Sequence, residues 1–142
     1  MRHVDVAAGI IWRGTTILCC QRPADRVQAG FWEFPGGKIR PGEDAAHALE
    51  RELEEELGIR VLQSQPLCTF THSYPEDGLE VHLHFFHVTA FAGEPRPREG
   101  QTLCWQAHDR AGELGFLAAN RDLVRTLRPP QPSESLTGDT VS

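Results

Sequence analysis

The sequence predicts a single α/β domain in which strands surround two helices. Three observations lead to this prediction. The chain has 142 residues, which suits one domain and is long enough to bury a hydrophobic core. Short runs rich in β-forming residues are separated by turns, and two other stretches place apolar residues at helical spacing. Strands combined with two helices are typical of an α/β or α+β sandwich.

Six segments have the apolar and aromatic composition of strands. They are Val4–Trp12, Thr16–Cys20, Phe31–Phe34, Val61–Phe70, Leu79–Phe91 and Leu103–Trp105. Arg13-Gly14-Thr15 predicts a hairpin-like connection between the first two. Pro35-Gly36-Gly37 predicts a tight turn after the third, because glycine permits close backbone approach. A glycine-rich turn is therefore expected at the end of a short aromatic strand.

The longer of the two predicted helices begins near Asp44 and ends at Gly58, where a left-handed glycine commonly closes a helix. Its apolar stripe comprises Ala46, Leu49, Leu53 and Leu57. A second helix is predicted over Asn120–Leu127, after a turn or short helix over Ala107–Leu114. The folded domain is assigned to residues 1–128. Residues 129–142 lack apolar residues to pack, so we expect a disordered tail.

Composition excludes several classes of protein. The net charge of −6 and the isoelectric point near 5.6 do not indicate a nucleic-acid polymer as partner. The four cysteines form no C-x-x-C pair, which predicts reduced thiols in the cytoplasm. No apolar stretch is long enough for a signal peptide or a membrane span. We expect a cytoplasmic protein without a membrane partner, either a monomer or a homodimer.

The longer helix carries an unusual density of acid, with five glutamates in seven positions. Glu52, Glu55 and Glu56 stand at i, i+3 and i+4 and therefore share one side. Like charges at this spacing cost about 0.2–0.5 kcal/mol per pair. A divalent cation held between carboxylates and substrate phosphates would reverse that cost. The pattern therefore predicts a metal–phosphate site, and the alternative is the solvated acidic face of an ordinary amphipathic helix.

The stretch from Gly37 to Ile59 follows the pattern G-x5-E-x7-R-E-U-x-E-E-x-G-U, where U is aliphatic. It resembles the Nudix box at every fixed position. The resemblance implies a mixed-sheet α/β/α sandwich that hydrolyses a nucleoside diphosphate linked to another moiety, with Mg²⁺ or Mn²⁺. It also implies metal ligands and their supports. The ligands are Glu52, Glu55, Glu56 and the Gly36 carbonyl, Arg51 orients a neighbouring carboxylate, and Glu43 is its structural partner.

The flanking residues resemble one branch of this family. Trp32 to Glu43, with its WEFPGGKI and PGE, resembles the MutT branch, which cleaves nucleoside triphosphates to monophosphates and pyrophosphate. Glu99 stands on a Pro/Gly-rich loop where that branch keeps a further metal-binding or base-like glutamate, and the alternative is an exposed loop acid. The predicted catalytic residues are therefore Glu52, Glu55, Arg51 and Glu99. Arg22 and Lys38 are candidates for phosphate contact or, equally, surface charges.

The choice of base depends on Asn120. It resembles the asparagine that binds oxidised guanine in 8-oxo-dGTP-hydrolysing members, and an amide offers both a donor and an acceptor; the alternative is a helix N-cap. Phe34 is a core residue that could also stack on a base. The first-choice substrate is 8-oxo-dGTP, which implies nucleotide-pool sanitation in support of DNA replication and repair.

Two other functions stay open. His82 and His84 match a strand pattern of a cytidine-preferring relative in the branch, so the main alternative is a (d)CTP or modified-pyrimidine pyrophosphohydrolase. A non-catalytic lesion-sensing Nudix module is a further alternative, which the complete box disfavours. The same two histidines share one strand face. Because no cysteine or acid stands at ligand spacing beside them, we expect them on a sheet face or near the base pocket and not in a zinc site.

Overall fold

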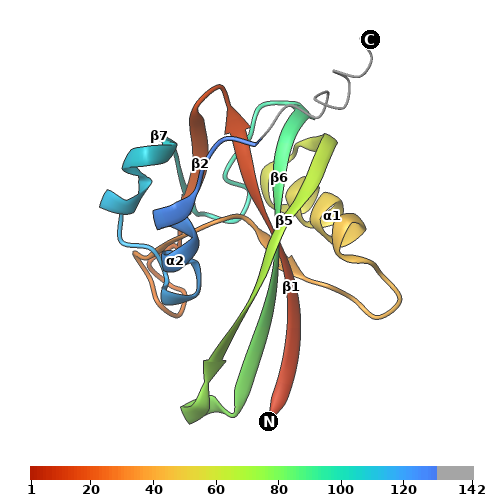
Figure 1. Cartoon of the computed structure of the whole chain (residues 1–142), viewed down its shortest axis with the longest axis vertical. Coiled ribbons are helices and arrows are strands. Elements are labelled where there is room, and N and C mark those ends of the chain that lie inside the picture. The colour runs from red at the N-terminus through yellow and green to blue at the C-terminus, as the bar shows by residue number, and fades with distance from the viewer. Residues whose placement is uncertain (131–142) are drawn as a thin grey trace.

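The computed structural model describes residues 1–130 and has the predicted mixture of strands and helices (Figure 1). The strands are β1 (Arg2–Arg13), β2 (Thr16–Gln21), β3 (Trp32–Glu33), β4 (Gly36–Lys38), β5 (Arg60–Tyr74), β6 (Leu79–Ala92) and β7 (Thr102–Ala107). The α-helices are α1 (Ala45–Leu57) and α2 (Ala118–Thr126), and the 3-10 helices are η1 (Pro75–Asp77) and η2 (His108–Glu113). None of the helices within residues 1–130 has the length and apolar composition of a membrane span.

The sheet is mixed, as the family resemblance implies. Its strands lie in the order β3-β2-β1-β6-β5, with β4 added to β1 and β7 added to β2. β1 runs parallel to β6 and antiparallel to β2 and β4. The parallel pair is possible because the connection from β1 to β6 contains α1 and several strands, which is ample for a crossover. β1 therefore joins both halves of the sheet.

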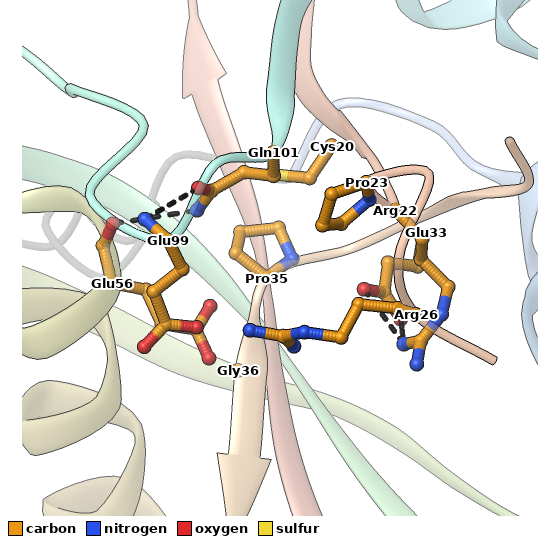
Figure 2. A pocket seen from close by; sticks show the side chains of 10 residues that line it. All are labelled: Cys20, Arg22, Pro23, Arg26, Glu33, Pro35, Gly36, Glu56, Glu99 and Gln101. Carbon is orange, nitrogen blue, oxygen red and sulfur yellow. Dashed lines mark hydrogen bonds and ion pairs between the residues drawn. The ribbon is translucent and has the colours of Figure 1, made fainter. Parts of the chain in front are cut away.

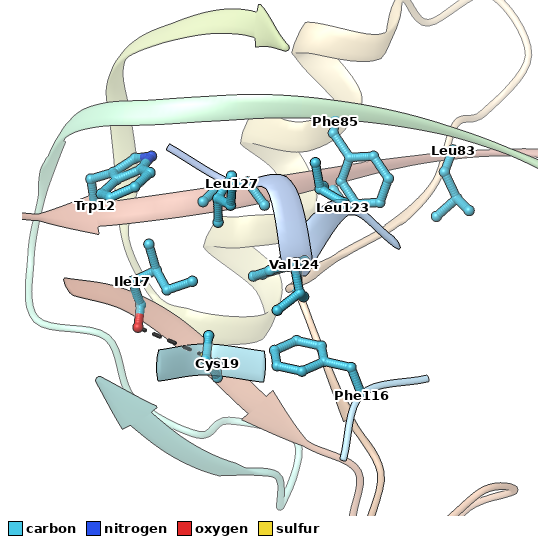
Figure 3. Close-up of a cluster of buried hydrophobic side chains, with 13 residues drawn as sticks. Trp12, Ile17, Cys19, Leu83, Phe85, Phe116, Leu123, Val124 and Leu127 are labelled. Atoms are coloured by element: carbon cyan, nitrogen blue, oxygen red, sulfur yellow. Dashed lines mark hydrogen bonds between the residues drawn. The ribbon is translucent and has the colours of Figure 1, made fainter. Parts of the chain in front are cut away.

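Two hydrophobic cores lie on opposite faces of β1, because successive strand residues point to opposite sides. Ala7 and Ile11 face α1, where Leu49, Leu53 and Leu57 are fully buried. Ala8, Ile10 and Trp12 face α2 (Figure 3). The second core also contains Ile17, Cys19, Phe34, Leu83, Phe85, Ala111, Phe116, Leu123, Val124 and Leu127. The two helices thus cover the two faces of one sheet.

Several element boundaries differ from the predictions. β5 extends to Tyr74 and meets β6 through η1, whereas the sequence predicted its end at Phe70. The predicted turn at 35–37 is partly strand, since β4 pairs with β1. α2 begins at Ala118 with Leu117 as its N-cap, so the N-cap interpretation of Asn120 is wrong. Ala46 is only half-buried. Of the predicted tail, residues 131–142 lie outside the described residues.

A buried histidine ties β1 to β6 and predicts an acid-sensitive fold. The Trp12 indole Nε1 donates to Nδ1 of His87 at 2.9 Å, and both residues are buried. Burial lowers the pKa of His87. As the pH falls, His87 therefore takes up a proton in the unfolded chain at a higher pH than in the folded protein. The free energy of unfolding decreases as the pH falls below the ordinary histidine pKa of about 6.5.

We expect His87→Gln, which keeps an acceptor for Trp12 but cannot titrate, to lose less stability than wild type on acidification. Urea unfolding midpoints of both proteins at about pH 7.5 and about pH 5.5, on either side of the histidine range, measure this difference. An identical acid-induced loss in both proteins would contradict the assignment.

Candidate active site

Two glycines allow β4 to pair closely with β1 while it also lies against α1. Gly36 pairs with Ala8 and Gly37 with Ala7 in an antiparallel ladder. A Cβ atom on Gly36 would overlap the carbonyl oxygen of Ala7, and one on Gly37 would overlap the carboxylate of Glu52. At Gly36 only glycine fits, because every other residue carries a Cβ that would meet the backbone, whereas at Gly37 a Cβ would require the Glu52 carboxylate to move. The glycine turn thus brings a strand backbone against the acidic helix.

The ends of α1 are fixed by the residues that the sequence predicted. The Asp44 carboxylate accepts from the His47 backbone N–H at 2.8 Å, which caps the first turn. Gly58 adopts φ 73° and its N–H donates to the Glu54 carbonyl, which closes the last turn. With Leu49, Leu53 and Leu57 buried against the sheet, the rotation of the helix is set. Its acidic side then lies along β4.

Arg51 holds three segments of the site together. Its Nε and Nη2 donate to the two carboxylate oxygens of Glu43 at 2.8 and 2.9 Å, a bidentate pair. Nη1 donates to Oε2 of Glu52 at 2.9 Å, and Nη2 also donates to the Lys38 carbonyl at 3.0 Å. The Arg51 side chain is 19% exposed. Arg51 therefore lies between Glu43 and Glu52 and contacts both carboxylates.

Glu43 is held as a carboxylate. Hydrogen bonds from the Arg51 side chain and then from the Arg40 backbone N–H lower the pKa of Glu43 to about 2. The loop before α1 is therefore tied to the middle of the helix by a charge that persists across the neutral range. Glu52, which shares Arg51, gains a fixed orientation from the same network.

We expect Arg51→Lys to reduce kcat by about 10–100-fold with a small change in KM, since groups that orient metal ligands contribute at this level. A lysine ammonium cannot reproduce the planar fork that contacts Glu43 and Glu52 together. Steady-state kinetics measure the split between kcat and KM, and Arg60→Lys, an exposed arginine after α1, is the matched control. A variant with wild-type kcat would contradict the orienting role.

A cavity of about 150 Å³ opens at the C-terminal half of this helix (Figure 2). Its lining residues are Cys20, Arg22, Pro23, Arg26, Glu33, Pro35, Gly36, Glu56, Glu99 and Gln101. Glu56 and Glu99 lie on one side and Arg22 on the other, and the Arg26 guanidinium extends across toward the carboxylates. Cations facing carboxylates across a cavity suit a phosphate chain with a divalent cation.

The carboxylates in this cavity are crowded. Burial, then the nearby charges of Glu99 and Glu52, raise the pKa of Glu56, while the Gly36 backbone acts in the opposite sense. The loop that carries Glu99 is anchored to the helix end, because the Arg98 backbone N–H donates to the Glu56 carbonyl at 3.2 Å. A divalent cation between these carboxylates would offset both the burial of their charge and their mutual repulsion. The donor set of carboxylates beside a glycine backbone therefore fits Mg²⁺, a cation that takes oxygen ligands.

The structure does not bring every predicted ligand equally close. Glu55 is 49% exposed and turns toward Arg51 and Arg40, at 3.5 and 4.0 Å. Among residues 1–130, no three acids of the helix and its loop place their oxygens within 4.8 Å of one another. Glu52 and Glu56 are neighbours, and Glu99 lies beside Glu56. Glu55 would have to leave Arg51 to join them.

The predicted phosphate contacts separate into two places. Arg22 lines the cavity, where its Nη1 donates to Glu33 at 3.2 Å and its Nε donates to the Val27 carbonyl at 2.7 Å. Lys38 is exposed on another groove beside His3 and Asp5, and only its carbonyl contacts the site. Sequence reasoning missed Arg26 and Glu33. Arg26 stands four positions after Arg22 in one polar loop, and this second arginine is the signal that was available.

Phe34 and Asn120 connect α2 to the glycine turn. Phe34 is 5% exposed and packs on Phe116 and Phe85, so its core interpretation is confirmed. The Asn120 side chain is also buried, and its Oδ1 accepts from the Phe34 backbone N–H at 3.2 Å. Phe34 stands two residues before Gly36. Asn120 therefore fixes the backbone that leads into the acidic site.

The fold and this site define a Nudix hydrolase. The sequence model of the NUDIX domain matches residues 7–126, and the chain belongs to this family. Among curated relatives, the chain is 38% identical over 137 residues to the CTP pyrophosphohydrolase of Escherichia coli K12, covering 94% of this chain and all of that protein. It is also 38% identical over 131 residues to a putative 8-oxo-dGTP diphosphatase 2 of Mycobacterium tuberculosis H37Rv, covering 89% and 92% of the two chains.

Solved structures agree with the fold. The solution structure of the Escherichia coli ORF135 protein superposes with a TM-score of 0.78 at 39% identity, covering 87% of each chain. A MutT structure from a study of Aliivibrio salmonicida and Vibrio cholerae gives a TM-score of 0.76 at 38% identity, covering 88% of this chain and 96% of that one. The predicted family and its MutT-type branch are therefore confirmed.

Proposed function

We propose that this Nudix chain is a Mg²⁺-dependent nucleoside triphosphate pyrophosphohydrolase. It would break the bond between the α- and β-phosphates, with water adding its oxygen to phosphorus and the products being a nucleoside monophosphate and pyrophosphate. The observation that carries this proposal is the cavity in which Glu56 and Glu99 face Arg22 and Arg26 across Gly36. A chain of phosphates needs both kinds of group, cations for its charge and carboxylates for its metal.

We assign separate roles in metal binding, phosphate binding and proton transfer to the residues of the site. Glu52, Glu56 and Glu99, with the Gly36 carbonyl, would hold Mg²⁺, and Glu55 would join them after leaving Arg51. When bound, Mg²⁺ supplies neutralisation of the charge that develops on the phosphates. Arg22 and Arg26 bind phosphate oxygens from the opposite wall. Arg51 and Glu43 keep the Glu52 carboxylate aimed at the site, and the crowded carboxylates provide a place for the proton that the attacking water loses.

For the base we keep 8-oxo-dGTP as the first substrate and (d)CTP or a modified pyrimidine nucleotide as the second. Five of the similar curated proteins carry the name 8-oxo-dGTP diphosphatase, and two more, from two strains of Mycobacterium tuberculosis, carry the name putative 8-oxo-dGTP diphosphatase 2. The CTP pyrophosphohydrolase is matched over its whole length, which favours the second candidate.

With its four thiols free, the chain suits a reducing cytoplasm. We propose that it is a monomer or a homodimer.

A comparison of kcat/KM for 8-oxo-dGTP, dGTP, dCTP and 5-methyl-dCTP distinguishes the two candidate substrates. We expect Asn120→Ala to lower kcat/KM for the preferred nucleotide by about 10-fold more than for the others, the value of one lost hydrogen bond to a base. The Asn120 Oδ1 already serves Phe34, so the amide Nδ2 is the atom left for the base. An unchanged ranking would contradict base recognition by Asn120 without affecting the assigned reaction. Asn120→Asp, which keeps an acceptor but removes the donor, is the matched variant.

A further inference from the structure

A histidine–glutamate cluster lies outside the cavity at Glu56, at the end of the sheet where β1 begins. It consists of His3 on β1 and of Glu80 and His82 on β6. The parallel register places His3 opposite Glu80, and His82 follows two residues later on the same face. In Figure 1 the start of β1 lies beside the β5–β6 hairpin, beyond the reach of α1. None of the three residues lines the cavity at Glu56.

The separations of the three donor atoms match those around a zinc ion. Nδ1 of His3 is 2.9 Å from Oε1 of Glu80, and Nε2 of His82 is 3.5 Å from the same oxygen. The two imidazole nitrogens are 3.4 Å apart. Ligands at about 2.0–2.1 Å from a tetrahedral zinc ion stand about 3.3 Å from one another. The triangle therefore fits one face of a tetrahedron without movement of the backbone.

The surrounding side chains support the same geometry. The Thr71 hydroxyl on β5 is 3.1 Å from Nδ1 of His82, so it can accept the proton there and leave Nε2 free to bind a metal. The Ser73 hydroxyl donates to Oε2 of Glu80 at 3.5 Å, the oxygen that the metal would not use. Outer partners of this kind orient histidine and carboxylate ligands in metal sites. β5 thus completes a site whose ligands come from β1 and β6.

We propose that His3, Glu80 and His82 form a zinc site that joins the N-terminal end of β1 to the β5–β6 hairpin. Two imidazoles and one carboxylate suit Zn²⁺ and not Mg²⁺, which takes oxygen ligands. Three protein ligands leave a fourth position for water, and the half-exposed setting allows the ion to enter. The bound ion would stabilise the first residues of β1 against the sheet. Without it, these residues are held by their pairing with β6.

Isothermal titration with Zn²⁺, in excess Mg²⁺ to occupy the acidic site, tests the proposal. We expect wild type to bind one equivalent more than His82→Gln. Thr71→Ala should weaken that equivalent by about 10–100-fold, the effect of removing an outer partner, and Thr71→Ser should restore it. His72→Gln, which changes the next residue on the opposite face of β5, is the matched control and should titrate as wild type.

A second readout is independent of stoichiometry. Zn²⁺ should slow hydrogen exchange of the backbone amides at residues 2–5 in wild type and in His72→Gln, and not in His82→Gln. Co²⁺ should also give the intense visible absorption of a tetrahedral nitrogen-containing site only where His3 and His82 are both present. Equal zinc binding by wild type and His82→Gln, with equal exchange at residues 2–5, would overturn the proposal.

Discussion

Glu52→Gln is expected to lower kcat by about 10³-fold, within the 10²–10⁴-fold range of a positioned catalytic carboxylate. The change keeps the size of the side chain and removes its charge. The Glu52 carboxylate is 17% exposed, accepts from Arg51 at 2.9 Å and lies beside Glu56. An amide is a poorer ligand for Mg²⁺, and it would replace one of the three carboxylates that Arg51 contacts with a neutral group.

The matched control is Glu54→Gln, because Glu54 stands on the same helix and is exposed. In the described residues only its backbone carbonyl takes part in the contacts around the helix end, with Gly58 and Arg98. We expect wild-type kcat from this control. Circular dichroism and thermal unfolding establish that both variants keep the fold. Equal rates for the two glutamine variants would contradict the role of Glu52.

A pair of adjacent glycine substitutions should separate damage to the fold from damage to the site. In Gly36→Ala the new Cβ overlaps the backbone of Ala7 in β1, which cannot move without breaking the β1–β4 ladder. We expect a loss of about 3 kcal/mol in the free energy of unfolding, at the upper end of ordinary overpacking costs. Urea unfolding measures it.

In Gly37→Ala the new Cβ instead overlaps the end of the Glu52 side chain, which can swing away. The expected loss of unfolding free energy is about 1 kcal/mol, and kcat should fall by about 100-fold as the carboxylate leaves Arg51. Gly42→Ala is a control in the loop that follows β4, where nothing lies near the added atom but φ is 82° and strained for alanine. Wild-type kcat in Gly37→Ala would show that Glu52 need not occupy its observed position.

The local features of the site were predictable from the sequence because they depend on neighbours along the chain. Asp44 and Gly58 bound α1 as expected, and the stripe containing Leu49, Leu53 and Leu57 set its rotation. The fixed spacing of the Nudix box placed Arg51 beside Glu43 and Glu52. All of these contacts join residues within one helix or the loop before it. Capping and periodicity predicted the bounds and the buried side of the helix, and the family resemblance implied the roles of Arg51 and Glu43.

Features that depend on the folding of distant segments onto one another could not be predicted from the sequence alone. The approach of Glu99 to Glu56 was expected only through the family resemblance, since 43 positions separate the two glutamates in the chain. The expectation that His82 and His84 lie outside a zinc site did not take His3 and Glu80 into account. Glu80 stands two residues before His82 on β6, whereas the approach of His3 depends on the parallel pairing of β1 with β6. Lys38 was a candidate for phosphate contact from the sequence, but the structure places its side chain on a different groove.

The most direct test of the proposed function is an analysis of products from 8-oxo-dGTP and from CTP, with Mg²⁺ and with a chelator. Ion-exchange chromatography separates monophosphate with pyrophosphate from diphosphate with inorganic phosphate. We predict monophosphate and pyrophosphate in equal amounts from at least one of the two nucleotides, only with Mg²⁺, and at a rate about 10³-fold lower in Glu52→Gln. Release of diphosphate and inorganic phosphate, or hydrolysis that persists with the chelator, would contradict the assignment.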